Sequence, residues 1–163
     1  MSTTSTLHYA RRASAQHTRS MLGARFTYLA DAEQTDGRLA VIDVTAHRGL
    51  EPPPHVHTRE DEAMYVLEGE WTFHCGGTDT DAVPGDFIWL PRGVPHHFTM
   101  RTQDGRAVLM LTPAGLEAAF RELGDPMEDP LGAPLPPQHP PSLSEMTQLM
   151  GDHGVQFVAP PVT

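Results

Sequence analysis

The stretch HVHTREDE, residues 55–62, places two imidazoles and a carboxylate close together in the chain. On an extended backbone His55 and His57 point to the same side, because side chains alternate between faces with a period of two. A short turn can then bring Glu62 round to the same place. Neutral imidazoles with a carboxylate suit a borderline or hard divalent metal, and the lack of thiolates argues against Cu(I) or an iron–sulfur cluster. The stretch predicts three corners of a metal site, whose fourth ligand must come from elsewhere.

The composition narrows the kinds of partner. A chain of 163 residues, 39% hydrophobic and 20% charged, is typical of a single globular domain with its own core. The net charge of -10 disfavours electrostatic binding to nucleic acid or to an anionic membrane, since both favour clustered cations. We therefore expect a small-molecule or protein partner.

Several covalent mechanisms are excluded by missing residue types. All 11 basic residues are arginine, which removes Schiff-base chemistry and a phosphate-loop lysine. No serine occurs between Met21 and Pro141, so a serine nucleophile in the core is excluded. Cys75 is the only cysteine, which precludes an intrachain disulfide. No segment approaches the ~20 apolar residues that span a bilayer, and we expect a cytoplasmic protein.

The segments around the opening stretch indicate short strands separated by Gly/Pro turns. The first two are joined by turn-like residues 34–37, and the prolines at 52–54 stiffen the approach to His55. Such strands indicate an antiparallel sandwich or barrel rather than a βαβ fold. The expected strands span residues 21–30, 38–47, 63–67, 71–74, 87–90, 94–100 and 106–111, with a further short one between residues 77 and 84.

The sequence pattern changes from strands to helices after Thr112. That residue can cap a helix with Pro113 at its first position, and Ser142 with Glu145 matches a capping box for a second helix ending before Gly151. We therefore expect an N-terminal arm with a short strand near 7–10, a barrel that includes the first helix, an irregular Pro-rich connector, and a final helix with an edge strand. These parts span residues 1–19, 20–124, 125–141 and 142–163.

Two spaced motifs resemble those of the cupin superfamily. Gly49, five residues, His55-Val56-His57, four residues, Glu62, six residues and Gly69 resemble the first cupin motif at every position. Gly85, five residues, Pro91-Arg92-Gly93, two residues and His96 resemble the second. The resemblance nominates His96 as the fourth metal ligand. The family usually has asparagine where this chain has Met100, but that position is not a ligand in the family pattern.

The resemblance implies a single jelly-roll-like antiparallel cupin barrel with C-terminal helices. Residues 62–70, 91–96 and 111–117 look like those of small quercetinase-like (quercetin 2,3-dioxygenase-like) cupins. Such a protein would hold one divalent transition metal (Fe, Mn, Co, Ni, Cu or Zn) on His55, His57, Glu62 and His96. It would cleave a flavonol-like or other enolisable aromatic substrate with O2, and Glu62 is the candidate catalytic base.

Two other functions compete with the dioxygenase. Small cupin polyketide cyclases share much of the same sequence, which suggests a metal-dependent lyase or isomerase acting on a polyketide-like substrate. A non-catalytic small-molecule binding cupin is the third candidate. All three need a cavity, and strand parity makes five apolar residues compatible with an aromatic-accepting one. They are Met64, Val66, Phe73, Phe98 and Met100.

The neighbouring polar residues carry weaker predictions. His97 follows His96 on a strand and should point away from it, with a supporting role at most. Cys75 and His74 face opposite ways and make a poor nucleophilic pair, so Cys75 is read as a small hydrophobic residue. Of the acidic run at 60–62, only Glu62 has motif support. Open sheet edges are compatible with a homodimer, although no residue specifies one.

Overall fold

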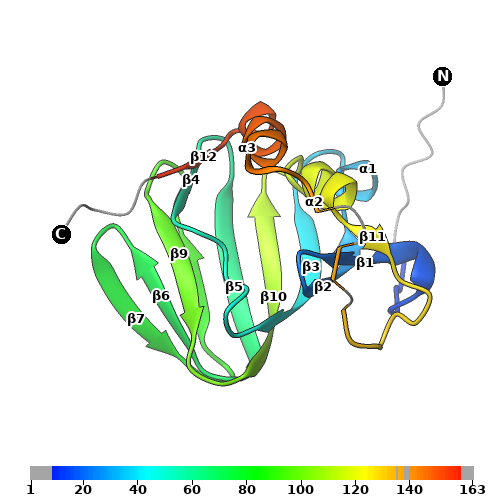
Figure 1. Cartoon of the computed structure of the whole chain (residues 1–163), viewed down its shortest axis with the longest axis horizontal. Coiled ribbons are helices and arrows are strands. Elements are labelled where there is room, and N and C mark those ends of the chain that lie inside the picture. The colour runs from blue at the N-terminus through cyan, green and yellow to red at the C-terminus, as the bar shows by residue number, and fades with distance from the viewer. Residues whose placement is uncertain (1–8, 135, 138–139, 159–163) are drawn as a thin grey trace.

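Two antiparallel β-sheets enclose one hydrophobic core in the computed structural model, which describes residues 9–134, 136–137 and 140–158 (Figure 1). The larger sheet has seven strands in the order β11-β1-β2-β3-β10-β5-β8, and the smaller has five in the order β12-β4-β9-β6-β7. The strands are β1 (Thr18–Met21), β2 (Ala24–Ala30), β3 (Ala40–His47), β4 (His55–His57), β5 (Asp61–Glu68), β6 (Trp71–Cys75), β7 (Thr78–Ala82), β8 (Phe87–Leu90), β9 (His96–Met100), β10 (Asp104–Thr112), β11 (Asp125–Pro126) and β12 (Val155–Phe157). This jelly-roll arrangement confirms the predicted fold class.

The core follows from the alternation of side chains along the strands. On β3, Ala40, Ile42 and Val44 are buried while the residues between them are only partly covered. On β5, Met64 and Val66 are buried, whereas Tyr65 between them is 41% exposed. The inward-facing side chains of these strands therefore lie between the two sheets.

The N-terminal third differs in detail from the sequence prediction. The expected strand at 21–30 is a hairpin of β1 and β2, whose turn holds Leu22 and Gly23 at positive φ. The expected turn at 34–37 begins within the short helix α1 (Ala32–Thr35), which forms because Asp31 makes a capping box with Gln34. A short 3₁₀ helix, η1 (Ala15–His17), precedes β1. The strand expected near 7–10 lies partly outside the described residues, and Tyr9 and Ala10 are not in a strand.

The first C-terminal helix begins later than expected. Thr112 remains in β10, where it pairs with Asp61, so it cannot cap a helix, and α2 spans Glu117–Leu123. The buried Glu117 carboxylate accepts hydrogen bonds from the backbone N–H groups of Ala32 and Gly115 at 2.8 and 2.6 Å. These bonds tie the start of α2 to α1. The connector, expected to be irregular, begins with the two-residue β11, which pairs with β1.

The last helix and strand lie over one end of the two sheets (Figure 1). Helix α3 (Leu143–Asp152) begins with the predicted capping box of Ser142 and Glu145, and it ends at Asp152 rather than before Gly151. Strand β12 pairs with β4 at the edge of the small sheet, as expected for an edge strand. Within the described residues, no helix is long and apolar enough to cross a membrane.

Gly105 on β10 packs closely against side chains of β6 and β9, and this packing allows a prediction about stability. A Cβ at Gly105 would collide with Met100 Cε and lie 2.7 Å from Cζ2 of the fully buried Trp71. We expect Gly105→Ala to destabilise the fold by about 1–3 kcal/mol through overpacking. Chemical denaturation measures the change in unfolding free energy. The control Gly151→Ala has open space on α3 and should stabilise by up to about 1 kcal/mol; equal effects of the two variants would contradict this account.

Candidate metal centre

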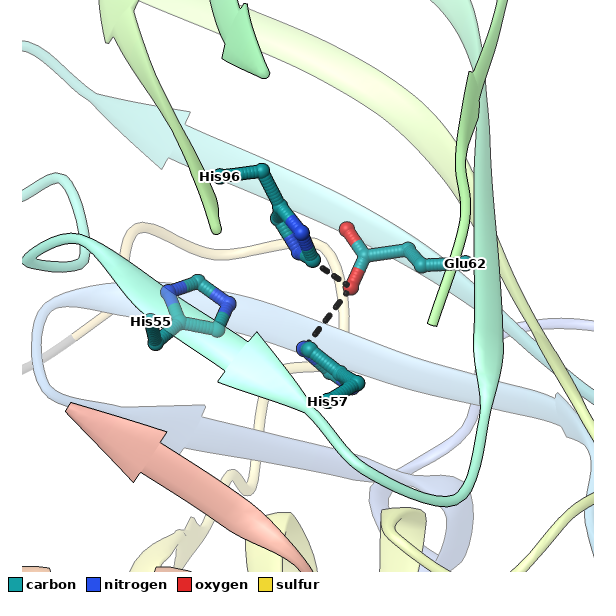
Figure 2. A group of neighbouring side chains, drawn as sticks. All are labelled: His55, His57, Glu62 and His96. Carbon is teal, nitrogen blue, oxygen red and sulfur yellow. Dashed lines mark ion pairs between the residues drawn. The ribbon is translucent and has the colours of Figure 1, made fainter. Parts of the chain in front are cut away.

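The four predicted ligands converge from three strands (Figure 2). His55 and His57 lie on β4, Glu62 on β5 and His96 on β9. The direct cross-strand pairing of His55 with His96 brings those two rings together. One ligand atom from each of the four side chains lies within 4.8 Å of every other. The chain therefore forms the predicted cluster with all four members present.

Local hydrogen bonds turn two of the imidazoles towards the centre. His55 Nδ1 lies 2.8 Å from the carbonyl oxygen of Pro53, and His96 Nδ1 lies 3.0 Å from that of Val94. A carbonyl oxygen only accepts, so Nδ1 carries the hydrogen in both rings and Nε2 keeps its lone pair. The arrangement at these two residues is the one that a metal-binding histidine requires.

The Glu62 carboxylate faces two of the imidazoles. Its Oε2 lies 3.3 Å from His57 Nε2 and 3.8 Å from His96 Nε2, as the dashed lines in Figure 2 show. The three imidazole rings have centroids between 4.7 and 5.1 Å apart. His96 Nε2 is buried without a hydrogen-bond partner among the described residues. A buried polar atom in that position is an available metal ligand.

Burial and charge set the protonation states. Burial lowers the pKa of His55 to about 4, against smaller upward effects of Glu62 and the Pro53 carbonyl, so this ring is neutral at neutral pH. Burial also acts to lower the pKa of His96, but the neighbouring Glu62 carboxylate outweighs it and the pKa is raised. For Glu62, burial acts to raise the pKa, yet the nearby histidines, His96 foremost, lower it. A metal bound at His96 would displace a proton from this imidazole and would balance the negative charge of Glu62.

The donor set fits a divalent transition metal. Three imidazole nitrogens and one carboxylate oxygen, without a thiolate, suit borderline and hard divalent ions. Four protein ligands leave about two positions free if the ion is six-coordinate. Cys75 is not part of the cluster, and burial raises the pKa of its thiol. His74, next to it, instead pairs with Asp79 and stacks on His97, with ring centroids 4.4 Å apart.

Two acidic residues near the cluster were missed in the sequence. Glu60 is 3% exposed, and its Oε2 lies 3.8 Å from His57 Nδ1. Its spacing of three residues from His57 was the available signal, although that spacing alone does not fix the direction of a side chain in a turn. Glu51 accepts hydrogen bonds from the backbone N–H groups of Gly49 and Met100 at 2.7 and 3.0 Å. It therefore ties the end of β9, where the family usually has asparagine, to the loop before β4.

A cavity of about 650 Å³ adjoins the cluster, and all four ligands contribute to its wall. No lysine or arginine occurs among the described residues that line it. Of the five apolar residues predicted for a substrate pocket, Met64 and Phe98 line the cavity, while Val66, Phe73 and Met100 pack in the core behind it. Most of the wall is apolar and comes from both sheets and from α2 and α3, including Phe26, Leu90, Leu109, Phe120, Met146 and Met150.

Comparison with known proteins identifies the class. Residues 42–113 match the family model described as a cupin domain. The chain is 32% identical over 100 residues to quercetin 2,3-dioxygenase of Bacillus subtilis (strain 168), in a match that covers 61% of this chain and 30% of that protein. The predicted resemblance to quercetinase-like cupins is confirmed. The chain thus matches less than a third of this relative's length.

Solved structures agree with the fold. KdgF from Halomonas sp. superposes with a TM-score of 0.53 at 21% identity, covering 68% of this chain and 91% of that one. Streptomyces PAC13 with uridine superposes with a TM-score of 0.52 at 20% identity, covering 66% and 85%. At such identities the likeness shows the fold alone.

The ligand set predicts metal content. Purified without chelator, the protein should contain close to one divalent metal ion per chain, and His55→Ala should bind that metal at least ~10-fold more weakly. Elemental analysis and a chelator competition measure both. His74→Ala, on the exposed side of the small sheet, is the control and should keep its metal. A wild-type protein without metal even after reconstitution would refute the site.

Proposed function

We propose that the protein is a metal-dependent dioxygenase that cleaves a flavonol-like or other enolisable aromatic substrate with O2. The observation that carries this proposal is the His55, His57, Glu62 and His96 cluster at the wall of an apolar cavity. Similarity to a quercetin 2,3-dioxygenase supports the reaction class. A divalent metal held by these four residues would act as a Lewis acid and, where redox-active, would exchange electrons with dioxygen.

Glu62 is the residue proposed to move the proton. Its carboxylate is 8% exposed and belongs to the cavity wall, and its lowered pKa keeps it ionised at neutral pH. A substrate hydroxyl placed within hydrogen-bond reach of an oxygen of this carboxylate can pass its proton to Glu62. The substrate then becomes the enolate and the carboxylate becomes the acid, so charge and atoms balance. The enolate is the electron-rich form that dioxygen attacks.

The cavity supports a neutral, largely aromatic substrate. Its volume lies in the range of about 300–1,000 Å³ that is usual for small-molecule pockets. Because no lysine or arginine lines its described wall, a carboxylate or phosphate on the body of the substrate, away from the metal cluster, would find no partner cation. Polar recognition is therefore concentrated at the metal cluster, while the aromatic body of the substrate packs on side chains such as Met64 and Phe98.

Oxygen consumption tests the proposal. The metal-loaded protein should bleach the flavonol absorbance and take up O2 in step with it, and His55→Ala should reduce the rate at least ~100-fold. Turnover that continues under strict anaerobiosis would overturn the dioxygenase. Ring closure of a poly-β-ketone without O2 would identify a cyclase, and metal-independent ligand binding without turnover would identify a binding protein.

A pair of variants on α3 tests the cavity as the binding site. Met146 lines the cavity and is half-buried, whereas Gln148 lies on the same helix and is exposed. Met146→Trp should fill part of the cavity and weaken flavonol binding about tenfold, or about 1.4 kcal/mol. Gln148→Trp should leave binding within about twofold. Fluorescence titration measures both affinities, and metal content should be the same in the two variants. Equal affinities would place the ligand elsewhere.

A further inference from the structure

The three histidines of the cluster differ in what their outer nitrogen faces. His55 and His96 direct Nδ1 at backbone carbonyls of the residues two positions earlier, Pro53 and Val94. His57 has no such carbonyl. Its Nδ1 is buried, makes no hydrogen bond among the described residues, and faces the carboxylate of Glu60. At His57, a carboxylate side chain faces Nδ1 where the other two histidines have a backbone carbonyl.

Glu60 is an acidic residue in a buried position. It is 3% exposed, and its Oε2 is buried without a hydrogen-bond partner among the described residues. The ion pair recorded for it is the one with His57, at 3.8 Å between Oε2 and Nδ1. That separation is about 1 Å longer than an N–H···O hydrogen bond. Two buried atoms without a hydrogen-bond partner, an imidazole nitrogen and a carboxylate oxygen, therefore face each other across a short gap.

The charged residues around the cluster also indicate a role for Glu60 beside His57. Glu60 and Glu62 are both buried, and no arginine in the described part of the chain forms an ion pair with either of them. The nearby Arg92 pairs with Asp61 instead, at 2.9 Å. Buried carboxylates without a cation are costly unless a metal or another partner balances them. A divalent ion at the cluster would balance these two carboxylates.

We propose that Glu60 is a positioning residue that holds the Nδ1–H of His57 and supplies the second negative charge for a divalent ion. With Nδ1 protonated and held by the carboxylate, His57 Nε2 keeps its lone pair for the metal and becomes a stronger donor. The inference rests on the metal centre and is independent of the dioxygenase reaction. The two buried acidic residues then have different roles, because Glu62 binds the metal directly and Glu60 acts through His57.

Glu60→Gln tests the role, because glutamine keeps the size of the side chain and removes its charge. The affinity for Zn²⁺, measured by chelator competition, should fall about 10- to 100-fold. In the metal-free protein the thermal midpoint of unfolding should stay the same or rise, because an unpaired buried charge is removed. A merely structural Glu60 would give the reverse pattern of a lower metal-free midpoint with unchanged Zn²⁺ affinity, and that pattern would overturn the proposal.

Two further variants sharpen the test. Asp61→Asn removes a charge from the adjacent residue, which pairs with Arg92, and should change Zn²⁺ affinity by less than about threefold. An equal loss in this control would show that overall charge is responsible. Glu60→Asp keeps the charge but shortens the reach to His57, and should weaken Zn²⁺ binding less than Glu60→Gln. A failure of wild-type protein to oxidise flavonols would refute the proposed reaction and leave these affinity differences standing.

Discussion

The cross-strand pair of His55 and His96 is the constraint on which the site depends. Strand β4 is only three residues long, so its position beside β9 must be secured from its other edge. The C-terminal strand β12 does this, since Val155 to Phe157 pair with His57 to His55. Thr58 adds a backbone hydrogen bond to Gly154 at 2.8 Å and a side-chain bond at 2.7 Å. The end of the chain thus fixes the strand that carries two ligands.

The same C-terminal segment also forms part of the cavity wall. Met146 and Met150 of α3 and Val155 of β12 belong to its wall, on the side of the molecule where Figure 1 shows α3 over the sheets. Position of the ligands and shape of the cavity are therefore coupled through one short piece of chain. A shift of β12 would move His55 and His57 together with part of the apolar wall. Because of this coupling, the proposed function depends on residues well beyond the segment that matches the cupin family model, which ends at residue 113.

The sequence predicted which four side chains come together better than it predicted their surroundings. His55 and His57 could be placed because the period of two along a strand fixes the direction of a side chain. The resemblance to the two cupin motifs supported Glu62 and nominated His96. Strand parity gives a face but not a depth, so Val66 and Phe73 share the inward side with Met64 without reaching the cavity. Glu60 lies in the turn before β5, where no period applies.

Competition between local and long-range bonding explains the error at α2. Thr112 has a good local capping signal, but the pairing of β10 with β5 at Asp61 keeps it in the strand. In the metal cluster, long-range packing likewise decides the chemistry. Burial alone would keep His55 neutral and would also neutralise Glu62. Only the nearby histidines keep Glu62 ionised, so burial holds His55 neutral while the close packing of the four side chains holds Glu62 as a carboxylate.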